Sequence, residues 1–342
     1  SWWPELSKYV MSKYIFIKIV PLLILISCTT VETQTNNTVV IDEPAKVDEN
    51  QLFMEYLDDD WEKNLNDNPL FASYTGDKSS NDKINSNSIE QFIKDKESDK
   101  NSLYLLEQID LSKLSKENKL NYKLKEFGLR NSVNAAEFPT YYLRLNQRGG
   151  IQSFYETGNR LVYATKKDYY DWFIRLEQFV DNINNSLVIN KEGLAKGHTQ
   201  PKLVTKGVIA QLDAIIKSDI SSNPYLKVFK DADESIINID DKNKLIDDAI
   251  LLIENRINPA YKRLHDFLLN DYLPNSRESI GIKDIPNGKK YYEYLARYYT
   301  TSDLTPNEIH NIGLREIERI RSEMEQIISE VEWDGDFLSF LN

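Results

Sequence analysis

Apolar residues recur with a period close to 3.6 along almost the whole chain from Gln51 onward, and this period constrains the fold more than any other feature. On the first such segment, one face carries Phe53, Tyr56, Leu57, Trp61 and Leu65. Helices with one apolar stripe bury it by packing against each other. We therefore expect a mainly α protein, a multi-helix elongated array or bundle with at most short β segments, of which residues 161–164 are the candidate.

Prolines and polar capping residues predict where the helices begin and end. The Asn68-Pro69 pair is expected to end the first helix, and residues 75–88 have the composition of a loop. Thr165 with Asp168 forms a capping box, and Pro201 suits the first turn of a helix. The other expected helices cover residues 89–109, 115–138, 201–217, 240–273 (two helices or one kinked at Pro259) and 288–299.

The last helix has the clearest start, a capping box at Thr305 and Glu308 with Pro306 at the first helical position. Its apolar stripe has the pattern of a buried face and comprises Ile309, Ile312, Ile317, Ile320, Met324, Ile327, Ile328 and Val331. Since the chain stops soon afterwards, we expect a C-terminally truncated helical domain over residues 51–342, with apolar surface exposed where partners are missing.

The N-terminal region has the pattern of a bacterial lipoprotein signal peptide. Residues 1–10 precede a credible start methionine and are interpreted as an upstream translation artefact. Residues 11–27 combine a positive start with an apolar run too short to span a bilayer comfortably, and Cys28 follows a small residue as a lipidation site. Residues 28–50 are polar and predict a flexible tether.

Charge and cysteine content exclude several classes of protein. The formal net charge is −12 and no basic cluster stands out along the sequence, so nucleic-acid binding, which needs phosphate neutralisation, is not expected. Cys28 is the only cysteine, so no disulfide can form within one chain. Stability must therefore come from an apolar core, which the 11% of aromatic residues can supply.

Motifs for chemistry are scarce. The three histidines, His198, His265 and His310, lack the His-Glu-x-x-His spacing of a zinc helix, and each is interpreted as an ordinary core or surface residue. No nucleophile elbow or phosphate loop is present. Two segments are more informative: residues 145–150, where glycines allow close approach of a ligand, and residues 298–301, where aromatic and hydroxyl groups can line a cleft. A plain turn and core packing are the alternative interpretations.

An ordered set of short motifs resembles a bacterial family, domain of unknown function 885. The first matching pieces are Asn146-Gln147-x-Gly149-Gly150, then Tyr169-x-x-Trp172-x-x-Arg175-Leu176, and then Glu192-Gly193 through Gly197 and Pro201. Two further pieces are Asn258-Pro259-Ala260-Tyr261 and Asp271-Tyr272-Leu273-Pro274 with Arg277. The last piece is Tyr299-Thr300-Thr301-x-x-Leu304-Thr305-Pro306-x-Glu308-Ile309-His310-x-x-Gly313-Leu314. They extend from about residue 52 to the end of the chain.

The resemblance implies a helical metallopeptidase of the gluzincin type, often secreted as a lipoprotein. This chain would then be the N-terminal half of a clamshell, and the His-Glu zinc motif would lie beyond its last residue. Zinc is thus expected in the full-length protein but not in this chain, which would have no catalytic residues. Gly149, Gly150, Tyr299 and His310 are the predicted borders of a substrate cleft.

Two functions remain open from the sequence. The first is the N-terminal portion of a lipid-anchored, zinc-dependent hydrolase acting on peptides. The alternative is a non-catalytic helical lipoprotein of the envelope, serving as a binding or scaffold module. Both place the protein on a membrane through the lipid on Cys28, and Thr29 after the cysteine favours the periplasmic face of the outer membrane.

Overall fold

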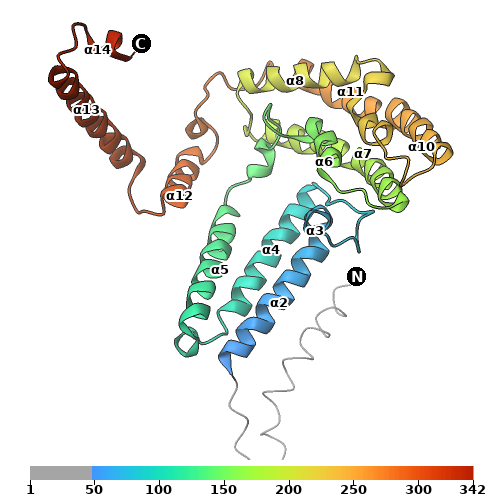
Figure 1. Cartoon of the computed structure of the whole chain (residues 1–342), viewed down its shortest axis with the longest axis horizontal. Helices are drawn as coiled ribbons and strands as arrows, with labels where there is room; N and C mark the ends of the chain where they lie inside the picture. Colours follow the sequence, from blue (N-terminus) through green and yellow to red (C-terminus); the bar gives the residue numbers. More distant parts are fainter. Residues whose placement is uncertain (1–47, 342) are drawn as a thin grey trace, which may run out of the picture. The chain divides into compact units, whose positions relative to one another are not determined.

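The computed structural model describes residues 48–341, and this part of the chain is built from helices without a β-strand (Figure 1). The predicted mainly α class is confirmed. Extended pairing in this range is limited to two isolated bridges, Asn146 with Gly149 and Pro201 with Arg277. Residues 161–164, the candidate strand, form an irregular connection. The signal peptide, Cys28 and most of the tether lie outside the described residues.

The α-helices follow one another with short connections. They are α2 (Glu49–Asp67), α3 (Pro69–Thr75), α4 (Ile89–Leu106), α5 (Lys116–Ala135), α6 (Tyr155–Arg160), α7 (Lys166–Ala195), α8 (Lys202–Ile216), α9 (Lys227–Lys230), α10 (Ile239–Leu252), α11 (Asn258–Phe267), α12 (Gly288–Thr300), α13 (Pro306–Glu330) and α14 (Phe337–Leu341). Short 3-10 turns include η3 (Thr140–Leu143) and η9 (Ile282–Asp284).

Local sequence signals account for most of these boundaries. Thr165 and Thr305 each accept a hydrogen bond from the third residue of their helix and complete the predicted capping boxes of α7 and α13. Asn68 separates α2 from α3, whose first residue is Pro69. Pro201 is the residue before α8 and not its first helical position, because its backbone is extended where it pairs with Arg277.

The predicted interruption at Pro259 takes the form of wide turns within one continuous helical segment. Residues Ile253–Ile257 form a π turn between α10 and α11, and Leu268–Tyr272 form a second one after α11. Pro259 lacks the N–H that would bond to the preceding turn, and the wide turn just before it accommodates this loss. The segment is one continuous helical run that the π turn before Pro259 divides into α10 and α11.

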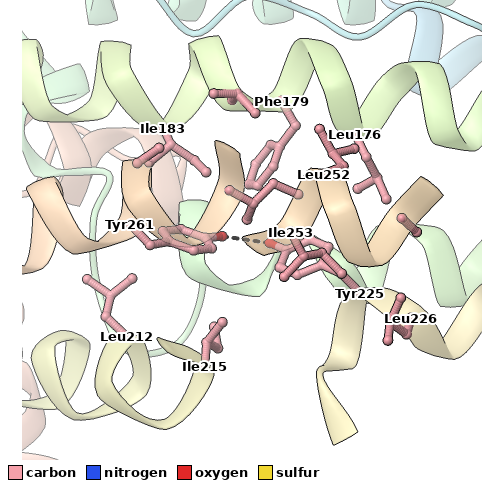
Figure 2. Packing of buried hydrophobic residues seen from close by; sticks show 14 of the residues in the cluster. Leu176, Phe179, Ile183, Leu212, Ile215, Tyr225, Leu226, Leu252, Ile253 and Tyr261 are labelled. Carbon is pink, nitrogen blue, oxygen red and sulfur yellow. Dashed lines mark hydrogen bonds between the residues drawn. The ribbon is translucent and has the colours of Figure 1, made fainter. Parts of the chain in front are cut away.

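The main apolar core lies among α7, α8, α10 and α11 (Figure 2). Leu176, Phe179 and Ile183 of α7 and Leu212 of α8 are all fully buried, and Tyr261 of α11 lies between the two helices. Two tyrosines cross this core: the hydroxyls of Tyr225 and Tyr261 lie 2.6 Å apart, and Tyr261 donates to the Ile151 carbonyl at 2.8 Å. Since Tyr261 uses its proton on Ile151, Tyr225 must be the donor of the pair.

A second, smaller core holds α2, α4 and α5 together. Its buried members are Phe53, Leu106, Ile109, Leu114, Tyr122 and Leu129. The rings of Phe53 and Tyr122 lie 6.0 Å apart and join α2 to α5. In this group of helices, α5 therefore turns one face inward around Tyr122 and Leu129 and leaves the opposite face to the solvent.

A line of polar side chains on α7 binds the loop between α3 and α4. Arg175 is fully buried, and its guanidinium donates to the carbonyls of Lys83 (2.8 Å) and Pro69 (3.1 Å) and to the Ser73 hydroxyl (2.7 Å). Farther along α7, Asn182 donates to the Asn85 carbonyl at 2.9 Å. Because the loop forms no regular secondary structure, these side chains provide hydrogen-bond partners for its backbone carbonyls.

The apolar stripe of α13 is exposed. Ile317 is 64% exposed, Ile320 46% and Ile327 50%, and α13 has no buried residue within the described part of the chain. The predicted capping box of α13 is thus confirmed, whereas the burial suggested by its pattern is not found. The same stripe agrees with the expectation of exposed apolar surface on this helix.

We expect Leu212→Ala to lower the free energy of unfolding by about 2–5 kcal/mol, because the fully buried side chain leaves a cavity among α7, α8 and α11. Urea unfolding followed by circular dichroism measures this change. Leu203→Ala on the same helix is the control, since Leu203 is 71% exposed and its truncation should cost well under 1 kcal/mol. Equal effects of the two substitutions would contradict the packing described.

Candidate functional site

The predicted glycine pair lies in a tight turn before α6. Asn146 and Gly149 bond to each other's backbone in both directions at 3.4 Å, and the Asn146 side chain accepts from the Arg148 amide at 2.9 Å. A side chain at Gly149 would meet open space, whereas a Cβ at Gly150 would lie 2.6 Å from Oε1 of Gln152. Only Gly150 is therefore required by the packing.

Side-chain amides hold this turn against α8. Gln152 is 2% exposed, and its amide donates to the Asn146 carbonyl at 2.8 Å and to Gln211 at 2.9 Å. Gln211 in turn donates to the Gln147 carbonyl at 2.9 Å. Oε1 of Gln152 is buried without a hydrogen-bond partner in the described structure. The turn is a fixed part of the fold, held by Gln152 and Gln211.

The other two predicted cleft residues lie on α12 and α13. Tyr299 is 77% exposed at the end of α12, and its ring lies 5.0 Å from that of Tyr298. His310 is exposed in the second turn of α13. The described contacts join neither residue to Gly149 or Gly150. The prediction that these four residues border one cleft therefore remains untested.

A row of aromatic rings connects Tyr299 to the body of the protein. Tyr291 and Tyr294 of α12 lie 5.0 Å and 5.6 Å from the ring of Phe138, measured between ring centroids. Tyr294 and Tyr298 stack at 6.1 Å. The hydroxyl of Tyr294 also donates to the Asn131 carbonyl at the end of α5, at 3.0 Å. This row places α12 against the segment that follows α5.

The C-terminal end of α7 forms a junction where several of the family-like motifs meet. Gly197 has a positive φ of 75°, and the amide of His198 donates to the Gly193 carbonyl at 2.8 Å, which closes the helix. A Cβ on Gly193 would lie 3.0 Å from the His198 carbonyl oxygen and 3.1 Å from the Tyr142 side chain. Glycine at position 193 thus lets η3 pack directly on this helix end.

Residues after α11 complete the junction. Nε of Arg277 donates to the Thr199 carbonyl at 2.9 Å, and the Lys202 amide donates to the Arg277 carbonyl at the same distance. The Tyr272 hydroxyl accepts from the Gln200 amide at 2.8 Å. The segment between α7 and α8 is therefore held by residues some 70 positions later in the chain.

A small pocket opens beside this junction. Its walls are mostly apolar and come from the segment after α5, from η3, from the connection between α7 and α8, and from α12 with the residues before it. They are Phe138, Pro139, Thr140, Leu143, His198, Ile285, Pro286 and Tyr291. His198 is 9% exposed, and its Nδ1 is buried without a hydrogen-bond partner in the described structure. The pocket, with a volume of about 10 Å³, therefore combines apolar walls with one unused polar atom.

Burial is the main electrostatic influence on the imidazole. It lowers the pKa of His198 below the ordinary value of 6.5, and the positive charge of Lys196 acts in the same direction, whereas a backbone hydrogen bond with Lys196 opposes them. The ring is thus neutral at pH 7. A neutral imidazole offers one donor and one acceptor nitrogen.

A charged group borders the pocket on α7. The Tyr142 hydroxyl donates to Glu192 at 2.7 Å, and Lys196 donates to the Tyr142 oxygen at 3.0 Å and to Glu192 at 2.5 Å. Lys196 and Tyr142 lower the pKa of Glu192. The ring centroids of Tyr142 and His198 lie 5.4 Å apart, so this group fixes one side of the histidine.

No sequence motif singles out His198, and the prediction for it is an ordinary core or surface histidine. The signal that marks it is the pair of glycines, Gly193 and Gly197, on either side of a helix end. Within residues 48–341, no three His, Cys, Asp or Glu side chains converge as metal ligands. The described residues therefore do not fit a zinc ion.

His198 should make stability depend on pH. The pKa of His198 is lower in the folded state than in the unfolded chain. Below about pH 6.5 the unfolded chain therefore binds more protons than the folded protein. The contribution of the neutral ring to the free energy of unfolding is thus complete above that pH and is lost as the pH falls. Unfolding free energies measured between pH 5 and 8 should rise with pH more steeply in the native protein than in His198→Gln. Leu143→Ala, which changes the pocket without a titrating group, should keep the native slope. Equal slopes for native and His198→Gln would contradict the assignment.

The two predicted glycines should respond differently to substitution. Gly150→Ala should destabilise the protein by about 1–3 kcal/mol, since the new methyl group forces the buried Gln152 amide from its hydrogen bonds. Gly149→Ala should be close to neutral in the same urea titration. Loss of stability in Gly149→Ala instead would show that the turn is packed differently.

Two solved structures share this fold. A protein described as "the putative lipoprotein from Colwellia psychrerythraea" superposes with a TM-score of 0.71 at 20% identity, over 84% of this chain and 52% of that one. A "putative lipoprotein of unknown function from Shewanella oneidensis" does so with a TM-score of 0.60 at 14% identity, over 84% of this chain and 48% of that one. At such identities the likeness shows the fold alone.

This chain spans about half the length of both solved structures. Among curated proteins, none matches it. A family profile matches residues 69–342, most of the described part. The chain therefore belongs to the family described as "Bacterial protein of unknown function (DUF885)".

Proposed function

We propose that this chain is the substrate-positioning part of a lipid-anchored hydrolase of the cell envelope, in which a zinc site outside the described residues cleaves peptides. The proposal joins family membership to the metallopeptidase character that the sequence resemblance implies. Of the two solved proteins of this fold, described as lipoproteins, the chain covers only about half the length. The anchor is the lipid on Cys28, and the periplasmic face of the outer membrane is the proposed location.

The pocket at His198 is the observation that carries the positioning role. Its walls are apolar apart from Thr140 and the imidazole, and its volume of about 10 Å³ admits only a water-sized group, so an apolar side chain of the peptide would rest against its mouth. Nδ1 of the neutral His198 is buried without a partner in the described structure, so it can bond to the peptide backbone only after the ring turns outward. Bound there, the peptide would lie beside Tyr291, the first ring of the tyrosine row on α12.

The chemistry itself is assigned to other residues. When bound, zinc polarises a carbonyl and generates a hydroxide from bound water. The residues in the described range do not fit this ion, and no catalytic step is derived for them. Their part is to bind the substrate and orient it, which by itself contributes to the rate by holding the reacting groups together.

The second candidate function is a non-catalytic envelope lipoprotein that binds an apolar ligand. The observation in its favour is the character of the pocket, whose titratable ring is held neutral by burial and faces apolar walls. Such a site binds without needing proton transfer. No helix within residues 48–341 has the length and apolar character needed to cross a bilayer.

Metal analysis and peptide cleavage distinguish the two functions. The protein expressed from its complete reading frame should contain about one zinc per chain and cleave quenched fluorescent peptides, and a chelator should abolish cleavage. Tyr291→Ala should raise KM several-fold with unchanged zinc content, because Tyr291 lines the pocket. Tyr292→Ala is the control, since that ring is 52% exposed and outside the pocket lining. A complete protein without zinc or cleavage would leave the binding function; cleavage by residues 28–342 alone would refute the division of roles.

A further inference from the structure

The outward face of α5 carries an apolar stripe that nothing in the described structure covers. Leu120 is 59% exposed, Leu124 62% and Phe127 48%. Their spacing of four and three residues puts them on one side of the helix, opposite the buried Tyr122. Three large apolar side chains this exposed in one row differ from the scattered single residues of an ordinary surface.

Lysines border this stripe on one flank. Lys116 and Lys123 are seven residues apart and therefore share that flank, and both side chains are exposed. Neither makes an ion pair within residues 48–341, whereas Lys125 of the same helix pairs with Asp60 on α2 at 2.5 Å. The two cations thus remain available for an external partner.

The charge of α5 is opposite to that of the chain. α5 carries five basic and two acidic residues, in a protein whose formal net charge is −12. No basic cluster is apparent along the linear sequence, because the lysines are spread over several turns of helix. Only the helical arrangement collects two unpaired lysines beside the apolar row.

We propose that this face of α5 lies on the surface of a lipid bilayer that contains anionic headgroups. Leu, Phe and Lys side chains arranged in this way are typical of helices that rest in the interface of a membrane, where apolar groups enter the acyl boundary and lysines contact lipid phosphates. The overall acidity of the chain makes a general attraction to such lipids impossible, so the attraction depends on this local reversal of charge.

This surface deepens the anchoring part of the proposed function and rests on it. A lipid on Cys28 brings the protein to the membrane, and a docked α5 then fixes how the helices face it. Hydrolysis and zinc binding are measured separately from docking, so failure of the docking can be distinguished from failure of the proposed function.

Vesicle flotation tests the proposal. The mature protein from residue 28, carrying Cys28→Ser so that no lipid is attached, is mixed with vesicles of phosphatidylcholine alone or with 30% phosphatidylglycerol (about a third anionic lipid, chosen to give a clear surface potential). We expect binding to the anionic vesicles, weakening in about 0.5 M salt. Lys116→Gln with Lys123→Gln should lower the partition coefficient about tenfold or more, since each lysine contributes about 1 kcal/mol at such a surface.

Leu120→Gln with Leu124→Gln should lower binding to the same vesicles at least fivefold while leaving the thermal unfolding curve unchanged, because both side chains are already exposed. The matched control is Leu203→Gln with Lys206→Gln, an exposed apolar residue and an exposed lysine on α8. Native binding by this control and reduced binding by the α5 variants support the proposal. Failure of the native protein to bind anionic vesicles, or equal binding by all variants, overturns it and leaves an acidic protein as the partner of this face.

Discussion

The buried guanidinium of Arg175 is the interaction on which the arrangement of the described helices depends. It lies at the centre of α7 with no exposed surface, and its acceptors come from α3 and from the loop before α4. No carboxylate lies within ion-pair distance of it in the described structure; Asn81 instead connects it to Asp168 and Asp171, at 3.4, 3.3 and 3.2 Å. Removing the hydrogen-bond partners of this buried cation would cost several kcal/mol of folding free energy. The same hydrogen bonds therefore hold the loop firmly against α7.

Through this arrangement α7 serves two different neighbours. Its apolar side forms the core with α8, α10 and α11. Its polar side supplies hydrogen-bond partners for the backbone of the loop between α3 and α4. The C-terminal end of α7 contacts a third neighbour, because Gly193 and Gly197 allow η3 and the segment before α8 to approach this helix end closely. The pocket at His198 lies just beyond this end of the thirty-residue helix.

Sequence reasoning reached the class of fold, most of the helix boundaries and the family. It did so where the signal is local: a capping box at Thr165 or Thr305 needs only residues three positions apart. It missed the polar side of α7, because Arg175 and Asn182 look like the solvated face of a helix until the loop that they bind is in place. For the same reason it found the glycine turn at Gly149 and Gly150 but passed over His198, whose surroundings come from three distant segments.

The sequence by itself determined that the chain is helical, where its helices begin, and that a lipid anchor is expected at Cys28, since periodicity, capping and the signal pattern are properties of neighbouring residues. Only the tertiary structure decided which polar groups are buried, which apolar stripes remain exposed on α5 and α13, and that a proline segment passes through π turns. Burial and pairing depend on which distant segments come together, and no local pattern contains that information.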